Sequence, residues 1–217
     1  MPIINMVYKK KKGWQPWANT IAYYPLSSNL IDASWNSSDI IPSDSSSVIG
    51  NYQGIDCFNL NWYYCTVSNI DTLATSNEYT FNFWLYRTAR FDIMYAENGS
   101  RWAWWLMMYS GESQARWGNK TNQSTAFFEP PYNTWLNIVF TVLNWEWSIY
   151  VNNNKTVLKS SWVLAPNHNG TPLIIGGDYA YNNQGNWYLS KLIIEDRWWT
   201  AQEVADYYNQ TKATYWL

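Results

Sequence analysis

The chain has 217 residues, of which 47% are apolar and 14% are charged, and its formal net charge is -2. This composition supplies enough apolar surface for one large all-β domain, and the sequence contains no apolar run long enough to cross a bilayer. The small negative charge argues against a general nucleic-acid-binding protein, which usually carries a broad basic surface to neutralise phosphates. We therefore expect a globular protein with no nucleic-acid partner and no membrane span.

Residues 1–18 read as an N-terminal arm that precedes a single domain at residues 19–217. The arm carries the basic run Lys9–Lys12. A solvated arm accounts for this run, and a contact with an acidic partner surface is the alternative. No export signal is visible, because the apolar stretch Ile3–Val7 comes before the lysines and no longer apolar stretch follows them. The arm is a candidate for docking onto a larger assembly.

The folded part begins with a strand at Asn19–Leu26, followed by a long Ser/Asn/Asp-rich loop at Ser27–Ser47. Acidic and amide side chains gather in this loop, and a further aspartate follows a Gly-Gly turn late in the chain. Oxygen ligands of this kind bind calcium, whereas the alternative is turn chemistry, in which such side chains bond to nearby backbone amides. The candidate calcium ligands are Asp32, Asn36, Asp39 and Asp178.

Short β-type runs separated by turn residues make up most of the remaining chain. They are Tyr52–Phe58, Trp62–Val67, Tyr79–Arg87, Phe91–Ala96, Trp102–Tyr109, Trp135–Leu143, Trp147–Val151, Pro172–Ile175 and Trp187–Glu195. The alternation is clearest in Tyr79–Leu85, where every second residue is a large apolar one and forms a core face. Many short strands at this spacing predict an antiparallel sandwich or barrel.

Two further local patterns concern the cysteines and the C-terminal segment. Cys57 and Cys65 flank a predicted hairpin tip, so a cross-strand disulfide is geometrically possible, although two cysteines are weak evidence for one. Thr200 and Glu203 have the spacing of a capping box, with apolar residues following at helical spacing. We expect one short helix at Ala201–Asn209.

Aromatic residues that could bind a sugar gather between Arg101 and Trp117. Sugar binding uses aromatic faces together with polar hydrogen-bonding groups, but half of any strand's aromatic residues must face the core. Only one alternate set, such as Trp105 and Tyr109, is therefore free for a ligand. The candidate carbohydrate-binding residues are Trp105, Tyr109, Arg116 and Trp117.

The sequence lacks the residues that catalysis on a β-sandwich would need. A retaining glycosidase places two carboxyl groups on one strand face, often as Glu-x-Asp-x-Glu, and no such triplet occurs. Glu195 and Asp196 are adjacent and so would face opposite sides of a strand, and Glu146 stands alone. The single histidine, His168, lies in a segment of loop composition. We expect no enzymatic activity.

Four segments, in this order, resemble the laminin G-like and concanavalin A-like lectin superfamily, in particular its bacterial and phage domains. They are Ala22–Leu26 with Asp32–Asn36, then Tyr79–Leu85, then Asn133–Thr141 with Ile149–Asn152, and finally Ile174–Asp178, Lys191–Arg197 and Thr200–Tyr208. The resemblance implies an antiparallel jelly-roll β-sandwich with one short C-terminal helix. It also implies recognition of glycans or protein surfaces, and a location outside the cell or on a virion.

The chain departs from this family at turns where glycine is common. Trp35, Trp62 and Trp145 stand at such turns, and Trp187 is a fourth candidate; the chain holds 17 tryptophans and only 10 glycines. Tryptophan is a poor physical substitute at positive φ. Two explanations stay open: some UGA codons are read as glycine in the source organism, or the surface is rich in tryptophan. A UGG codon at Trp35, Trp62 and Trp145 would exclude the first.

The sequence therefore leads to three hypotheses about function. The first is a carbohydrate- or surface-binding module on a phage virion or a secreted bacterial protein, with calcium as a candidate cofactor. The second is a purely structural decoration domain that has no affinity for glycans. The third is a glycoside hydrolase, which the absence of paired carboxylates disfavours.

Overall fold

The structure is a computed structural model that describes residues 19–26, 30–34, 36, 38–43, 49–60, 64–67, 77–88, 91–98, 101–109, 114–118, 123–127, 131–144, 146–160, 172–176 and 187–216. For residues 91–98, 101–109, 114–118, 123–127 and 157–160 only the strand pairing of the backbone is described. The predicted N-terminal arm, residues 1–18, lies outside the described residues.

Two antiparallel sheets and a C-terminal helix make up the fold, as predicted. The larger sheet runs in the order β13-β12-β11-β6-β15-β4-β3, with β1 paired to β15 beside β4, and the smaller runs β10-β9-β8-β7-β14-β5-β2. The strands are β1 (Thr20–Tyr24), β2 (Ile40–Pro42), β3 (Ile49–Tyr52), β4 (Ile55–Asn59), β5 (Cys65–Val67), β6 (Glu78–Arg87), β7 (Phe91–Asn98), β8 (Arg101–Tyr109), β9 (Gln114–Gly118), β10 (Gln123–Phe127), β11 (Trp135–Leu143), β12 (Glu146–Val151), β13 (Asn154–Ser160), β14 (Leu173–Ile175) and β15 (Trp187–Glu195). The helix α1 spans Ala201–Thr211, and the 3-10 turn η2 spans Lys212–Tyr215.

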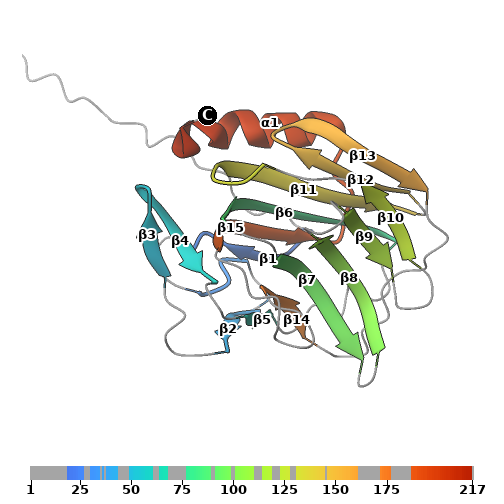
Figure 1. Ribbon diagram of the computed structural model, residues 1–217, viewed down its shortest axis with the longest axis horizontal. Coiled ribbons are helices and arrows are strands. Elements are labelled where there is room, and N and C mark those ends of the chain that lie inside the picture. Colours follow the sequence, from blue (N-terminus) through green and yellow to red (C-terminus); the bar gives the residue numbers. More distant parts are fainter. Residues whose placement is uncertain are drawn as a thin grey trace, which may run out of the picture.

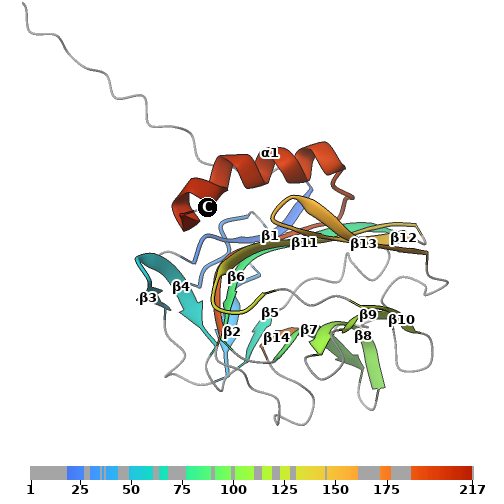
Figure 2. The same ribbon diagram turned by 45° about the horizontal axis from the view of Figure 1, so that its top comes forward.

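The described elements lie in three layers. The smaller sheet faces one side of the larger sheet, and α1 covers the opposite side (Figures 1 and 2). The β3–β4 hairpin curls away from the rest of the larger sheet at one edge (Figure 2). The larger sheet therefore has two buried faces, whereas one face of the smaller sheet is turned away from the other layers.

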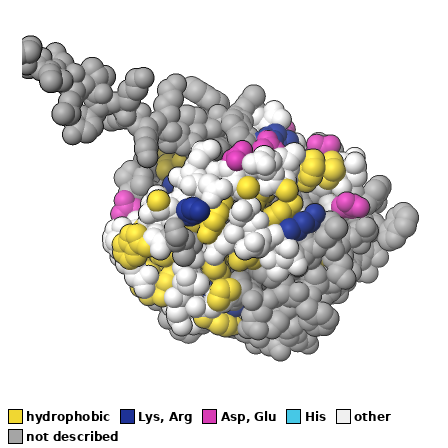
Figure 3. All heavy atoms as spheres, turned by 90° about the horizontal axis from the view of Figure 1, so that it is seen from above, with side chains coloured by type: hydrophobic (Ala, Val, Ile, Leu, Met, Phe, Trp, Pro, Cys, Tyr) yellow, Lys and Arg dark blue, Asp and Glu magenta, His cyan; other side chains and the backbone are white. Residues whose placement is uncertain are grey.

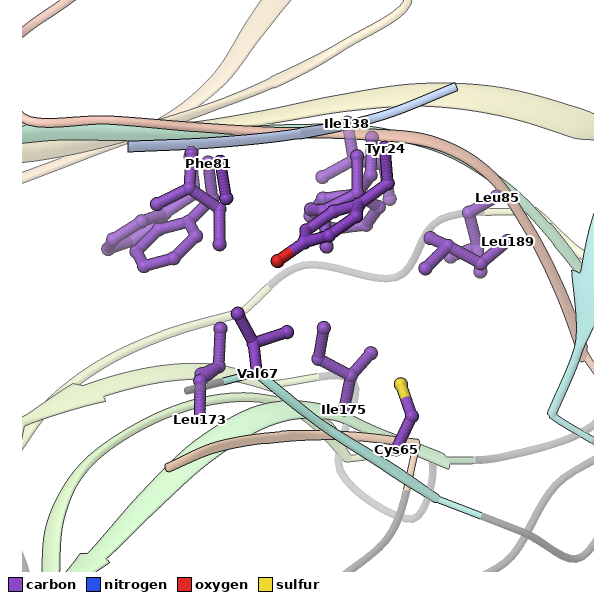
Figure 4. Packing of buried hydrophobic residues seen from close by; sticks show 14 of the residues in the cluster. Tyr24, Cys65, Val67, Phe81, Leu85, Ile138, Leu173, Ile175 and Leu189 are labelled. Carbon is purple, nitrogen blue, oxygen red and sulfur yellow. The ribbon is translucent and has the colours of Figure 1, made fainter. Parts of the chain in front are cut away.

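Side-chain alternation on the larger sheet divides the buried apolar residues into two clusters. On β6, Phe81, Phe83 and Leu85 belong to the cluster between the sheets, whereas Trp84 and Tyr86 belong to the cluster beneath the helix. Figure 4 shows the first cluster, with residues of the larger sheet pointing toward Val67, Leu173 and Ile175 of the smaller sheet. The period-two pattern predicted for Tyr79–Leu85 is confirmed.

A capping box starts the C-terminal helix, as the sequence predicts. The Thr200 hydroxyl accepts a hydrogen bond from the Glu203 N–H at 3.2 Å, and the Glu203 carboxylate accepts one from the Thr200 N–H at 2.8 Å. These bonds satisfy two of the amide groups that a helix leaves without partners at its start. Val204 and Tyr207 then bury one side of the helix against the larger sheet.

The strands differ from the prediction in three respects. The segment Tyr52–Phe58 is not one strand but the turn and second strand of the β3–β4 hairpin, whose turn residues Gln53 and Gly54 have φ of 51° and 76°. Positive φ at both central residues matches the twist of paired strands. The predicted loop Ser27–Ser47 contains β2, which pairs with β5. Strands β9, β10 and β13 have mixed polar sequences and were not predicted at all.

The cysteines lie on different sides of the larger sheet. Cys57 belongs to the cluster beneath the helix and Cys65 to the cluster between the sheets, and both are free thiols. The cross-strand disulfide is therefore absent. Among the described residues, no helix is long and apolar enough to cross a membrane.

Candidate functional site

The predicted carbohydrate-binding residues lie on two neighbouring strands of the smaller sheet. Trp105 and Tyr109 are on β8, and Arg116 and Trp117 are on β9. The register pairs Trp105 with Gly118, Met107 with Arg116 and Tyr109 with Gln114. Directly paired residues share a face of an antiparallel sheet, so Trp105, Arg116 and Tyr109 lie on one face. Trp117 pairs with Leu106 and lies on the other face.

The pairing across the sheet shows which face carries the three residues. Trp105 pairs with Tyr95, and Tyr95 pairs with Ile174, which is half-buried. Leu106 pairs with Met94, and Met94 pairs with Ile175, which is buried in the core between the sheets. By register, Trp105, Tyr109 and Arg116 therefore lie on the face turned away from the larger sheet. Trp117 lies on the core face.

The predicted calcium cluster is built as a hydrogen-bonded turn in the part that the structure describes. Asp32 Oδ1 accepts hydrogen bonds from the backbone N–H groups of Tyr23 and Ser34, both at 2.8 Å. Asp32 Oδ2 accepts from the Ser34 hydroxyl at 2.5 Å and from the Ser38 N–H at 3.1 Å. A carboxylate has about four lone-pair sites, and these four bonds use them.

The other candidate ligands give no further support to a calcium site. Asp39 accepts from the Asp32 N–H at 2.9 Å, and the Asn36 amide donates to the carbonyls of Thr20 and Ile21, both at 2.9 Å. These are the contacts expected of turn chemistry. Asp178 lies outside the described residues. Within the described ranges, no group of three or more His, Cys, Asp and Glu side chains could hold a metal. The calcium site stays a prediction, which the bonds of Asp32 do not favour.

The carboxylate of Glu195 is held by contacts that stabilise the fold. It is fully buried, and its Oε2 accepts hydrogen bonds from the Trp199 indole at 2.5 Å and forms an ion pair with Arg197 Nε at 2.9 Å. Its Oε1 accepts from the Thr20 hydroxyl at 3.2 Å. Burial raises the pKa of Glu195, while the Trp199 and Arg197 contacts lower it. These contacts attach the start of the helical segment to β15 and β1. His168 lies outside the described residues.

Two of the described tryptophans bear on whether some tryptophan positions are glycines in the source organism. Trp187 is fully buried in β15 and does not have a positive φ, so nothing in its backbone favours glycine. Trp216 follows η2 with φ of 60° and is 70% exposed. Helices commonly end with glycine in this left-handed conformation. Trp35, Trp62 and Trp145 lie outside the described residues.

A second group of aromatic residues was missed by the sequence analysis. Tyr52, Tyr86 and Tyr188 come from β3, β6 and β15, and we call them the tyrosine triad. The rings of Tyr52 and Tyr188 are stacked, with centroids 3.8 Å apart and planes 13° apart. Tyr52 and Tyr188 are half-buried, and Tyr86 is 5% exposed. The Gln-Gly turn after Tyr52 was the available signal for the hairpin, but no local pattern indicates that the three rings meet.

Comparison with solved structures establishes the fold. Domain 4 of AbnA, a GH43 extracellular arabinanase from Geobacillus stearothermophilus solved with arabinotriose, is similar with a TM-score of 0.71 and 16% identity, covering 87% of this chain and 98% of that one. The binding domain of Paraclostridial Mosquitocidal Protein 1 is similar with a TM-score of 0.71 and 19% identity, covering 88% and 52%. A botulinum neurotoxin type C chain that interacts with two ganglioside molecules has a TM-score of 0.68 and 11% identity, covering 88% and 51%.

The chain is thus an antiparallel β-sandwich with a C-terminal helix, the fold it shares with these domains. It spans about half the length of the two toxin chains and nearly all of the arabinanase domain. No family model and no curated protein matches the sequence.

Proposed function

We propose that this protein is a non-catalytic carbohydrate-binding module whose ligand lies on the face of the smaller sheet that is turned away from the larger sheet. One observation carries the proposal: the register of β7, β8 and β9 assigns Trp105, Tyr109 and Arg116 to the face away from the core. Aromatic rings bind the apolar faces of sugars, and a guanidinium donates hydrogen bonds to hydroxyl and carboxylate oxygens. The similar arabinanase domain was solved with arabinotriose, which supports a glycan as the ligand class.

The same proposal includes the setting of the module. The resemblance to laminin G-like phage and bacterial domains supports a virion or secreted surface protein that recognises a host or particle surface. The arm at residues 1–18 would dock onto the larger assembly. Deletion of this arm should then release the module from the assembly without changing the affinity of the isolated module for its glycan.

A glycan array with the full chain and three variants tests the binding proposal. Trp105→Ala and Arg116→Ala should each weaken binding about fivefold or more, which corresponds to about 1 kcal/mol per lost contact. Trp117→Phe is the matched control, because residue 117 lies on the core face and an aromatic replacement keeps its bulk. Unchanged affinity in both Trp105→Ala and Arg116→Ala would contradict the proposed site. Repeating the assay with a chelator tests for calcium.

The alternative from another class is a structural decoration domain. It predicts no binding to any arrayed glycan together with tight incorporation into a particle. The glycosidase alternative predicts release of reducing sugar from a bound glycan. The carbohydrate-binding proposal predicts instead that at least one arrayed glycan binds to the face that carries Trp105 and that no reducing sugar is released.

A further inference from the structure

A row of paired residues crosses the seven strands of the smaller sheet on the face turned away from the larger sheet. From β2 to β10 the row consists of Ile41, Thr66, Ile174, Tyr95, Trp105, Gly118 and Gln123, each paired with the next. Adjacent strands lie about 4.8 Å apart, so six spacings give the row a length of about 29 Å. The candidate site at Trp105 is therefore one part of a longer surface feature.

The end of the row at β2 is open to solvent. Ile41 is 55% exposed, and Thr66 and Ile174 are half-buried. The residue that precedes each of these three belongs to the core between the sheets, so alternation along the strands directs the three side chains away from that core. The row therefore begins at the edge strand with an apolar side chain that a ligand can reach.

Tyr64 adds an aromatic side chain beside this end of the row. Its carbonyl accepts a hydrogen bond from the Ser43 N–H at 2.9 Å, and its N–H donates to the Ser43 hydroxyl at 3.2 Å, which continues the pairing of β5 with β2 by one residue. Tyr64 is half-buried and precedes the buried Cys65, so alternation places it on the same face as Thr66. Aromatic residues therefore occur on this face both next to β2 and at Trp105 on β8.

The row contains no charged residue. Its contacts with a ligand would be apolar contacts and hydrogen bonds, which are the contacts that the faces and hydroxyl groups of sugar rings make. The opposite side of the molecule differs, because Figure 3, which views it from the side of α1, shows both basic and acidic side chains among the hydrophobic ones. The row is thus suited to a chain of uncharged sugar units.

We propose that the ligand of this module is a linear glycan that lies across the strands of the smaller sheet, along this row, and that Ile41 and Tyr64 contact it at the end away from Trp105. This inference rests on the proposed function, from which it takes the class of ligand. Ile41 and Trp105 are four strand spacings apart, or about 19 Å. A single sugar unit at Trp105 cannot reach Ile41, whereas a chain of several units can. Affinity should therefore rise with the length of the glycan.

A length series, measured by titration calorimetry on the full chain, tests this arrangement. The probes are linear arabinan oligosaccharides from the disaccharide to the hexasaccharide, or the same series of the glycan that binds best on the array. Wild type should bind the hexasaccharide at least tenfold more tightly than the disaccharide. Ile41→Ala and Tyr64→Ala should each weaken hexasaccharide binding about fivefold and leave disaccharide binding unchanged, whereas Trp105→Ala should weaken both. Ile41 is exposed, so its replacement should leave the fold intact.

Tyr23→Ala is the matched control for Tyr64→Ala, because Tyr23 is also half-buried but packs against the cluster beneath the helix. Equal losses in these two variants, with no loss in Ile41→Ala, would overturn the inference.

The other outcomes separate this inference from the proposed function. Weaker binding in Trp105→Ala alone, with equal wild-type affinity for every length, overturns the linear arrangement and leaves the proposed function in place. Absence of binding to every arrayed glycan overturns both. Self-association of the wild type that Ile41→Ala removes, as measured by sedimentation, would make the row an interface between two copies of this chain and would also overturn the inference.

Discussion

Two glutamates near the helix start should respond to pH in opposite directions. Burial raises the pKa of Glu195, so the folded protein holds this proton more tightly than the unfolded chain. The stabilising contribution of the protonated group is complete below the unfolded pKa of about 4.3 and is lost as the pH rises through the raised folded value. Relative to Glu195→Gln, the wild-type free energy of unfolding should therefore fall as the pH rises above the unfolded pKa and through the raised folded pKa, as measured by urea unfolding.

Glu203 provides the control for this experiment. Burial tends to raise its pKa, but the hydrogen bonds from Thr200 and Arg197 outweigh burial and hold the pKa of Glu203 below its usual range. Its contribution is present above the unfolded pKa and is lost as the pH falls through the lower folded value. The wild-type free energy of unfolding should therefore increase relative to that of Glu203→Gln as the pH rises from the lowered folded pKa to the unfolded pKa of Glu203. A difference of the same sign for both variants would contradict the assignment of Glu195.

Among the secondary-structure elements, the helix α1 is attached to the sheet through its first residues. The Thr80 hydroxyl donates to the Arg197 carbonyl at 2.8 Å and accepts from the Trp199 N–H at 3.0 Å, and Thr200 then caps the helix. Thr200→Ala should lower the free energy of unfolding by about 1 kcal/mol, because the Glu203 N–H loses its acceptor. Chemical unfolding followed by circular dichroism measures this change.

Thr200→Ser is the matched control for the helix cap, since serine keeps the hydroxyl and the variant should stay within about 0.5 kcal/mol of wild type. If Thr200→Ala were as stable as wild type, the hydrogen bonds of the capping box would contribute nothing to the attachment of α1. The packing of Val204 and Tyr207 against the sheet would then account for it.

The strength of the local pattern decided which elements were predictable. Strands β6 and β11 were predicted because large apolar residues alternate along them, and α1 because its cap and apolar spacing are local signals. Strands β9, β10 and β13 have polar or small residues at many positions, so their periodicity is weak. They form because neighbouring strands supply backbone hydrogen bonds, which no local pattern reports.

The candidate sites were predictable only in part, for the same reason. The aromatic composition of β8 indicated Trp105 and Tyr109, but only the register with β9 separates Arg116 from Trp117. The tyrosine triad could not be predicted, because Tyr52, Tyr86 and Tyr188 are far apart in the sequence and meet through the strand order β6-β15-β4-β3.

For the whole molecule, the larger sheet is shared by both hydrophobic clusters, and this arrangement should make their unfolding cooperative. Phe83 and Trp84 are successive residues of β6 that belong to different clusters. Separating either layer from the sheet would expose a full face of large apolar side chains, at a cost of about 25 cal/mol for each Å² of apolar surface. We therefore expect the helical layer and the inter-sheet core to unfold together.

The two buried thiols report on this cooperativity because each lies in one cluster. Burial raises the pKa of Cys57 to about 11 and raises the pKa of Cys65 further, so neither thiol should react with a disulfide reagent in the native state. As urea is added, both should become reactive at the same midpoint. The single variants Cys57→Ala and Cys65→Ala assign each reaction. A lower midpoint for Cys57 would mean that the helical layer opens first, while the sandwich stays closed around Cys65.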